Sequence, residues 1–166
     1  LIEGFSLIAD KHRGSCLVIG GGADSRAKSY LNDLLKRADQ SIDNKSFAYL
    51  GYLKEHDAHA LLKLSSVIVL PYVYAYASNS ILYWAFQHRK PVIASKIGTL
   101  REELEGYLET FLVQPHNSEQ IAMALDKVLT DDNLVGEATR FMASKASSIS
   151  WMRVIENIHK TYLSLL

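Results

Sequence analysis

The sequence predicts an α/β domain in which a parallel sheet is covered by helices on both faces, a three-layer sandwich. Short apolar runs alternate with segments of helical periodicity, and the connections between them are short. One of these runs, Val67–Leu70, is apolar throughout, as expected for a strand buried on both faces of a parallel sheet. With 166 residues, 48% of them hydrophobic, the chain suits one domain with a substantial core.

Each element is predicted from the period of its apolar residues or from residues at its ends. The opening helix, for example, has Leu1, Phe5 and Ile8 on one face. Asn117 with Gln120 resembles a capping box, which predicts that a helix begins there. In chain order we expect helix 1–10, strand 15–20, helix 24–37, strand 46–50, helix 55–64, strand 67–70, helix 80–88, strand 91–95, helix 100–104, strand 111–113, a helix through 121–129, and helices 133–144 and 150–166.

Composition and charge exclude several classes of protein. Formal net charge is zero, with 18 basic and 18 acidic residues, which argues against a dedicated nucleic-acid binder. Cys16 is the only cysteine, so the sequence has no internal disulfide and no thiolate metal cluster. No apolar run approaches the roughly 20 residues of a membrane span, and no signal peptide is visible.

The two ends of the sequence carry expectations of their own. The chain starts at Leu1 within what is predicted to be a helix, so we expect a fragment of a longer protein. The last helix has an apolar stripe, Trp151, Val154, Ile155, Ile158 and Tyr162. Packing against the core is the default expectation, and a crossing towards another domain of the intact protein is the alternative.

Two short motifs have a functional and a structural interpretation. Gly20-Gly21-Gly22 could belong to a dinucleotide site, but Ser25 stands where the third glycine of G-x-G-x-x-G would fall, so a tight turn is favoured. His56 and His59 are three apart, as metal ligands can be. Because no third ligand is near in sequence, solvated surface histidines are favoured.

The loops that follow the strands predict the place of a binding site. In open parallel sheets, ligands bind outside the carboxyl ends of the strands. We therefore expect the loops 20–22, 51–53, 71–80 and 96–99 to converge on one crevice. The third of these leads from a buried strand through small residues into a helix, and the first N–H groups of such a helix can bind an anion.

Several motifs, in order along nearly the whole chain, resemble one family. Leu17–Gly22 is similar to "LVIxGGG", Tyr49–Leu53 to "FLGxV" and Ser65–Tyr72 to "ADVxVLPS/Y". Lys90–Gly98 is similar to "GKPVIASxxGG" and Phe111–Asn117 to "GLLVPPGD". The chain thus resembles the carboxy-terminal, Rossmann-like half of retaining glycosyltransferases of the GT-B architecture, most of all family 4 (group 1).

The resemblance implies a nucleotide-sugar site built mostly from backbone. The loop formed by Ser78, Asn79 and Ser80, up to Ile81, would give N–H groups to the donor diphosphate or its sugar. The backbone around Leu53 would meet the nucleobase, and the turn at Gly21 would line the cleft.

Two acidic residues of the family pattern are missing. The family carries a glutamate pair spaced E-x7-E, and the matching positions here are Tyr76 and Trp84. The second glutamate normally accepts hydrogen bonds from the ribose hydroxyls, which an indole N–H cannot do. In an active enzyme the ribose would be held in another way, for instance by Tyr76; in a non-catalytic relative, Trp84 would fill the ribose position. Arg89 also stands where a glycine is usual, before Lys90.

The whole protein implied by the resemblance is a glycosyltransferase. It would move a sugar from a nucleotide diphosphate sugar to a glycan, lipid or saccharide acceptor, with no metal or other cofactor required. The acceptor site would lie on an amino-terminal domain that this chain lacks, so the fragment alone would be inactive. No nucleic-acid partner is expected, and the location would be cytoplasmic, with peripheral membrane association as an option. The alternatives are a binding or scaffolding domain that has lost the glutamate pair and, more weakly, a nucleotide-sugar epimerase.

Overall fold

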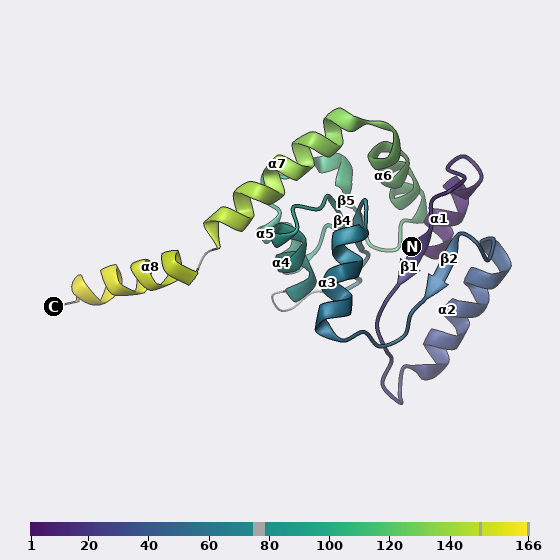
Figure 1. Ribbon diagram of the computed structural model, residues 1–166, viewed down its shortest axis with the longest axis horizontal. Helices are drawn as coiled ribbons and strands as arrows, with labels where there is room; N and C mark the ends of the chain where they lie inside the picture. Colours follow the sequence, from purple (N-terminus) through teal and green to yellow (C-terminus); the bar gives the residue numbers. More distant parts are fainter. Residues whose placement is uncertain (75–78, 150, 166) are drawn as a thin grey trace.

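The computed structural model describes residues 1–74, 79–149 and 151–165, except for the side chains of 151–154 and 157. Helices and strands alternate through most of the chain (Figure 1). The elements are α1 (Ile2–Ala9), β1 (Leu17–Ile19), α2 (Lys28–Ser41), β2 (Phe47–Tyr49), α3 (Glu55–Leu64), β3 (Ile68–Leu70), α4 (Ser80–Gln87), β4 (Val92–Ser95), α5 (Gly98–Glu103), a 3-10 turn (Glu109–Phe111), β5 (Leu112–Val113), α6 (Ser118–Thr130), α7 (Asp132–Ser148) and α8 (Trp151–Leu163).

All strand pairs are parallel, which confirms the predicted α/β class. The strands form two sheets, however, where one was expected: β1 pairs with β2, and a second sheet has the order β3-β4-β5. Leu17 lies opposite Phe47 in the first sheet, and Ile68 lies opposite Val92 in the second. The strands are only two to four residues long, so each pairing has few hydrogen bonds, and the described residues form no ladder between β1 and β3.

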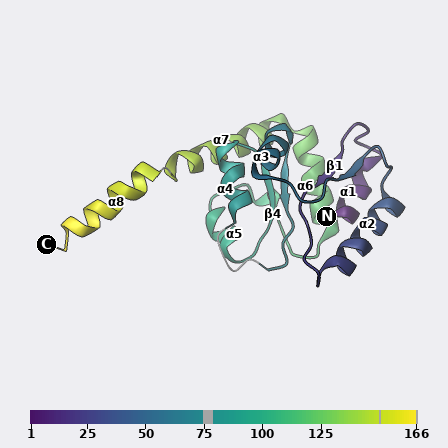
Figure 2. The ribbon, with the colours of Figure 1, turned by 60° about the horizontal axis from the view of Figure 1, so that its bottom comes forward.

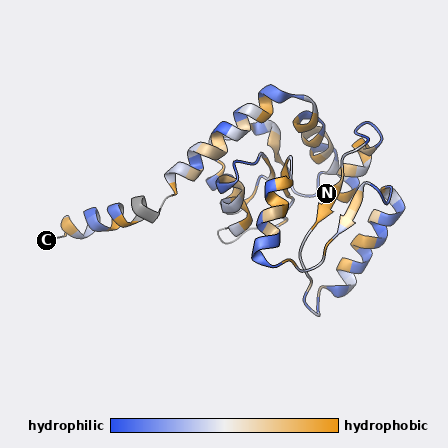
Figure 3. Ribbon diagram, viewed as in Figure 1, coloured by the Kyte–Doolittle hydropathy of each residue, from blue (hydrophilic) through white to orange (hydrophobic). Residues whose placement is uncertain are grey.

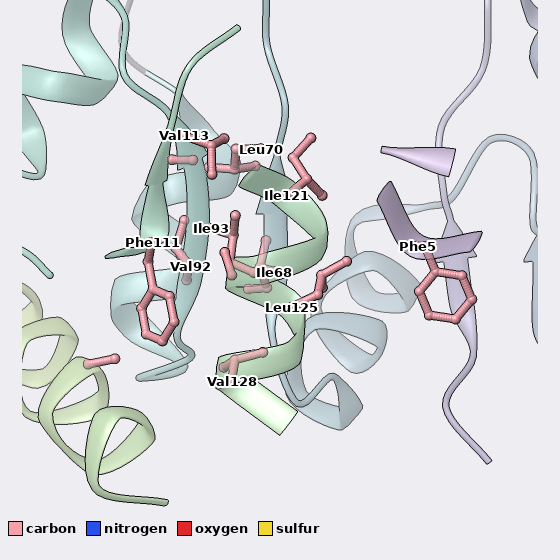
Figure 4. Close-up of a cluster of buried hydrophobic side chains, with 14 of the residues drawn as sticks. Phe5, Ile68, Leu70, Val92, Ile93, Phe111, Val113, Ile121, Leu125 and Val128 are labelled. Atoms are coloured by element: carbon pink, nitrogen blue, oxygen red, sulfur yellow. The ribbon is translucent and has the colours of Figure 1, made fainter. Parts of the chain in front are cut away.

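The core lies between the second sheet and the helices that cover it. All four residues of β4 are buried, as expected for a central strand covered on both faces. Helix α6 packs on β4 and β5, and Figure 4 shows Ile121 and Leu125 of α6 beside Ile68 and Ile93 of the sheet. Helix α1 packs on α6. The hydropathy of the chain is highest along the strands, as β1 and β2 show in Figure 3.

Several predicted boundaries are wrong by a few residues, each for a local reason. Helix α2 begins at Lys28 and not at Asp24, because the Asp24 carboxylate first accepts from the N–H groups of Arg26 (2.9 Å) and Ala27 (3.0 Å) in a turn. The last strand begins at Leu112, after the 3-10 turn.

Half of the predicted capping box forms at α6. Asn117 Oδ1 accepts from the N–H of Gln120 at 2.8 Å, as expected. The Gln120 side chain does not return this bond to Asn117. Its oxygen accepts from the N–H of Gln114 at 2.7 Å, which joins α6 to the end of β5.

The last helix does not pack as predicted. Figures 1 and 2 both show α8 extending away from the sheets. Its residues Ile155, Ile158 and Tyr162 are exposed, so the expectation that this stripe packs on the core is wrong. Among the described helices, none is long and apolar enough to span a bilayer.

The end of α4 explains why a glycine is usual at position 89. Arg89 has φ of 53°, in the left-handed region that favours glycine. Its N–H donates to the carbonyl of Phe86 (2.9 Å), and the N–H of Lys90 donates to that of Ala85 (3.0 Å), the two bonds of a Schellman motif. The motif therefore forms without its glycine and carries backbone strain.

We expect Arg89→Gly to raise the free energy of unfolding by about 1 kcal/mol, because it removes the strain of a side chain in a left-handed conformation. Urea unfolding followed by circular dichroism measures this. The control is Arg140→Gly in the interior of α7, where glycine should lower stability by about 1 kcal/mol. Equal destabilisation by both substitutions would contradict the explanation.

Candidate functional site

The loops after β1 and β2 are joined to each other. The N–H of Gly21 donates to the carbonyl of Gly51 at 2.7 Å, and Tyr49 Oη donates to the carbonyl of Gly21 at 2.9 Å. Both glycines have positive φ, 131° and 64°. The structure thus brings Gly21 beside the loop that carries Leu53, as the sequence predicts.

Close packing fixes the position of Leu53. A Cβ atom on Gly20 would lie 2.6 Å from Leu53 Cδ1, so the absence of a side chain at position 20 lets Leu53 lie over the end of β1. Leu53 itself is half-buried, and its loop leads directly into α3.

Asn79 begins α4 as its N-cap. Its Oδ1 accepts from the N–H groups of Ile81 (3.0 Å) and Leu82 (3.2 Å). Its φ is −106°, outside the left-handed region that favours glycine. The amide of Ile81 is therefore occupied by the cap, and Ser80 is the first residue of the helix. Two further predicted site residues, Tyr76 and Ser78, lie outside the described residues.

Trp84 packs between α3 and α4. Its ring centroid lies 4.4 Å from that of His59, with the planes tilted by 42°. His59 Nδ1 lies 2.8 Å from His88 Nε2, a hydrogen-bond distance, so one ring donates to the other. Trp84, His59 and His88 are all half-buried. Figure 1 shows the two helices side by side.

The prediction that both histidines of α3 are solvated holds only for His56. That residue is exposed and lies 2.9 Å from the Asp57 carboxylate. His59 is wrongly predicted, because its partners are on another helix and no local sequence pattern reveals them. Burial lowers the pKa of His88, and the nearby His59, Lys63 and Lys90 lower it further, so His88 is neutral at pH 7.

A separate hollow opens beyond β4. It has a volume of about 630 Å³, and Lys96, Gly98 and Arg101 are among its lining residues. Lys96 forms an ion pair with Glu109, which also lines the hollow. Gly21, Leu53 and Asn79 do not line this hollow, and the convergence of all the loops on one crevice stays a prediction. Within the described residues, no group of three or more histidine, cysteine or acidic side chains could hold a metal ion.

Comparison with known proteins identifies the family. Residues 1–131, well over half of the chain, match the family model described as "Glycosyl transferases group 1". The chain belongs to the group 1 glycosyltransferases. An uncharacterised glycosyltransferase of Methanocaldococcus jannaschii is 27% identical over the whole chain, which covers 42% of that relative. The chain thus spans about two fifths of the length of the curated relatives it matches.

Solved structures agree with this group 1 assignment at the level of the fold. Anabaena HepE, in complex with UDP and glucose, superposes on 99% of the chain and 44% of its own length, with a TM-score of 0.81 and 19% identity. The carboxy-terminal domain of LpcC from Francisella tularensis, a group 1 family protein, covers 89% of the chain and 76% of its own length, with a TM-score of 0.78 and 20% identity. The fold of this group 1 chain is that of a carboxy-terminal GT-B domain.

Proposed function

We propose that the chain is the donor-binding domain of a retaining glycosyltransferase. The intact enzyme would transfer a sugar, of the hexose type, from a nucleotide diphosphate sugar to a glycan, lipid or saccharide acceptor. The chain would bind the donor, and an amino-terminal domain would bind the acceptor. On its own, the chain would bind nucleotide without catalysing transfer.

The observation that carries this proposal is the hydrogen bond between Gly21 and Gly51, which holds two strand-end loops side by side where the second leads into α3. This is the edge where parallel sheets bind nucleotides. The proposed contacts are Gly21 and Leu53 at the nucleoside, and Ser78, Asn79 and Ser80 at the diphosphate, together with Ile81, Tyr76 and Trp84. HepE, a neighbour of the same fold, binds UDP and glucose.

Charge stabilisation in this site would come from backbone amides. Because the cap occupies the N–H of Ile81, the amides from Ser78 to Ser80 are the candidates for the diphosphate. No step of such a transfer needs a metal or another cofactor. We propose a cytoplasmic location, with peripheral membrane contact as an option for the whole protein.

The second candidate function is a binding or scaffolding domain without activity. The position of Trp84 favours it, because a half-buried indole stands where the family has a glutamate, and the indole cannot accept hydrogen bonds. The two candidate functions differ in whether a nucleotide can still bind to the site.

Titration calorimetry with UDP, GDP and ADP tests the proposal. We expect saturable binding of at least one of them. Gly20→Val should weaken it by about tenfold or more, because the new side chain collides with Leu53 and moves its loop. Gly136→Ala in α7 is the control and should bind like the parent chain. Absence of saturable binding to all three nucleotides would reject donor binding and leave the scaffolding function.

A further inference from the structure

One pair of polar groups on α3 is spaced to hold a single hydroxyl group. We propose that Glu55 and His59 together bind a ribose hydroxyl of the nucleotide, with Trp84 as the wall beside it. This inference rests on the proposed function, because it requires that a ribonucleotide enters the site. The ribose-binding carboxylate would then be Glu55 on α3, whereas the family pattern has a glutamate at the position of Trp84 on α4.

The spacing of the two side chains carries the argument. His59 Nε2 lies 3.9 Å from Glu55 Oε1, which is too far for a direct hydrogen bond. If an oxygen atom lay at a normal hydrogen-bond distance of about 2.8 Å from both atoms, the angle N···O···O at that oxygen would be about 90°. A hydroxyl group placed there can accept from the ring N–H and donate its proton to the carboxylate. The gap therefore matches one bridging hydroxyl.

Both side chains of the pair have surface exposed to solvent. The Glu55 side chain is 78% exposed and that of His59 is 29% exposed. Two carboxylates on neighbouring elements have other partners: Asp24 accepts from backbone N–H groups, and Glu103 accepts from Tyr83 Oη at 2.7 Å. The Glu55 carboxylate lies on α3 itself, one turn before His59, and is open to a ligand.

The contact with His88 allows the tautomer of His59 that carries its proton on Nε2. Because His88 is neutral, its Nε2–H can donate to His59 Nδ1 across the 2.8 Å contact. The proton of His59 then lies on Nε2, which faces the Glu55 carboxylate. In this tautomer the ring N–H of His59 is a donor beside the acceptor oxygens of Glu55, which is the arrangement that a bridging hydroxyl needs.

The position on the fold agrees with a ribose site. Glu55 is the first residue of α3 and directly follows the loop 51–54, which is joined to Gly21. A nucleoside whose base lies on that loop would place its ribose at the first turn of α3. One turn further along α3, the half-buried indole of Trp84 lies 4.4 Å from the His59 ring and would offer an apolar surface to the carbons of the sugar.

The test compares UDP with 2′,3′-dideoxy-UDP, which lacks both ribose hydroxyls. The parent chain should bind UDP about tenfold or more tightly than the dideoxy compound. Glu55→Ala should remove most of this preference while leaving the affinity for dideoxy-UDP nearly unchanged. His59→Phe keeps a ring against Trp84 but has no N–H, so it should have the same effect. Thermal unfolding of each variant checks that it is folded.

The control is Asp57→Ala, which removes another exposed carboxylate from the first turn of α3 and should keep the preference for UDP. If UDP binds and the preference survives in Glu55→Ala, the inference is wrong and donor binding stands. Equal affinity of the parent chain for both compounds also overturns it, since water then fills the gap. If neither compound binds, the proposed function itself fails for a uridine donor.

Discussion

Phe111→Ala should lower the free energy of unfolding by about 3–5 kcal/mol, the largest effect that we expect from a single substitution here. Phe111 has no exposed surface, and its ring lies 6.1 Å from that of Tyr107, centroid to centroid. It belongs to the buried cluster around β4 that Figure 4 shows. Because the strands are short, the sheet cannot close over the cavity without losing its few pairings.

Chemical denaturation with guanidinium chloride measures this loss. Tyr30→Ala provides the matched control, since it removes an aromatic ring that is 67% exposed on α2. It should change stability by less than about 0.5 kcal/mol. Similar losses in both variants would show that Phe111 is not part of a packed core.

Gly4→Ala should destabilise the protein by roughly 1–3 kcal/mol, although alanine is the better helix former. A Cβ at this position would lie 2.7 Å from the Ser118 carbonyl oxygen and 2.8 Å from Ile121 Cγ2. Helix α1 would have to move away from the start of α6. Since α6 packs on β4 and β5, this change would disturb the core beneath it.

The same glycine-to-alanine substitution should stabilise the protein at Gly136. A Cβ there would lie 3.5 Å from the flexible end of Arg140, an ordinary van der Waals contact, so we expect a gain of about 0.5–1 kcal/mol. Thermal unfolding of both variants measures these changes in stability. A stabilised Gly4→Ala protein would contradict the close approach of α1 and α6.

The elements of this fold were predictable because their signals are local. Helix α3 has the bounds that its apolar period predicts, Glu55–Leu64, and the continuous apolar run ending at Leu70 forms a buried strand. The separation into two sheets was not predictable, because strand pairing depends on contacts between distant segments. The same holds for the exposed stripe of α8, since periodicity shows which residues share a face but not what the face contacts.

The candidate site was predictable where backbone decides it. Gly21 and the loop around Leu53 do lie together, and Asn79 does begin a helix. The group formed by His59, His88 and Trp84 was missed because His59 and His88 are 29 residues apart. Only the packing of α3 on α4 makes them neighbours, and this packing also places Trp84.

We propose above that the chain binds a nucleotide at the strand ends near α3 and α4. The most direct measurement is a series of amide spectra of the isotopically labelled chain during titration with UDP. We predict saturable shifts at Gly21, Leu53 and the first residues of α4 from Asn79 to Ile81. Shifts confined to the hollow lined by Lys96 and Arg101, or to α8, would contradict the account.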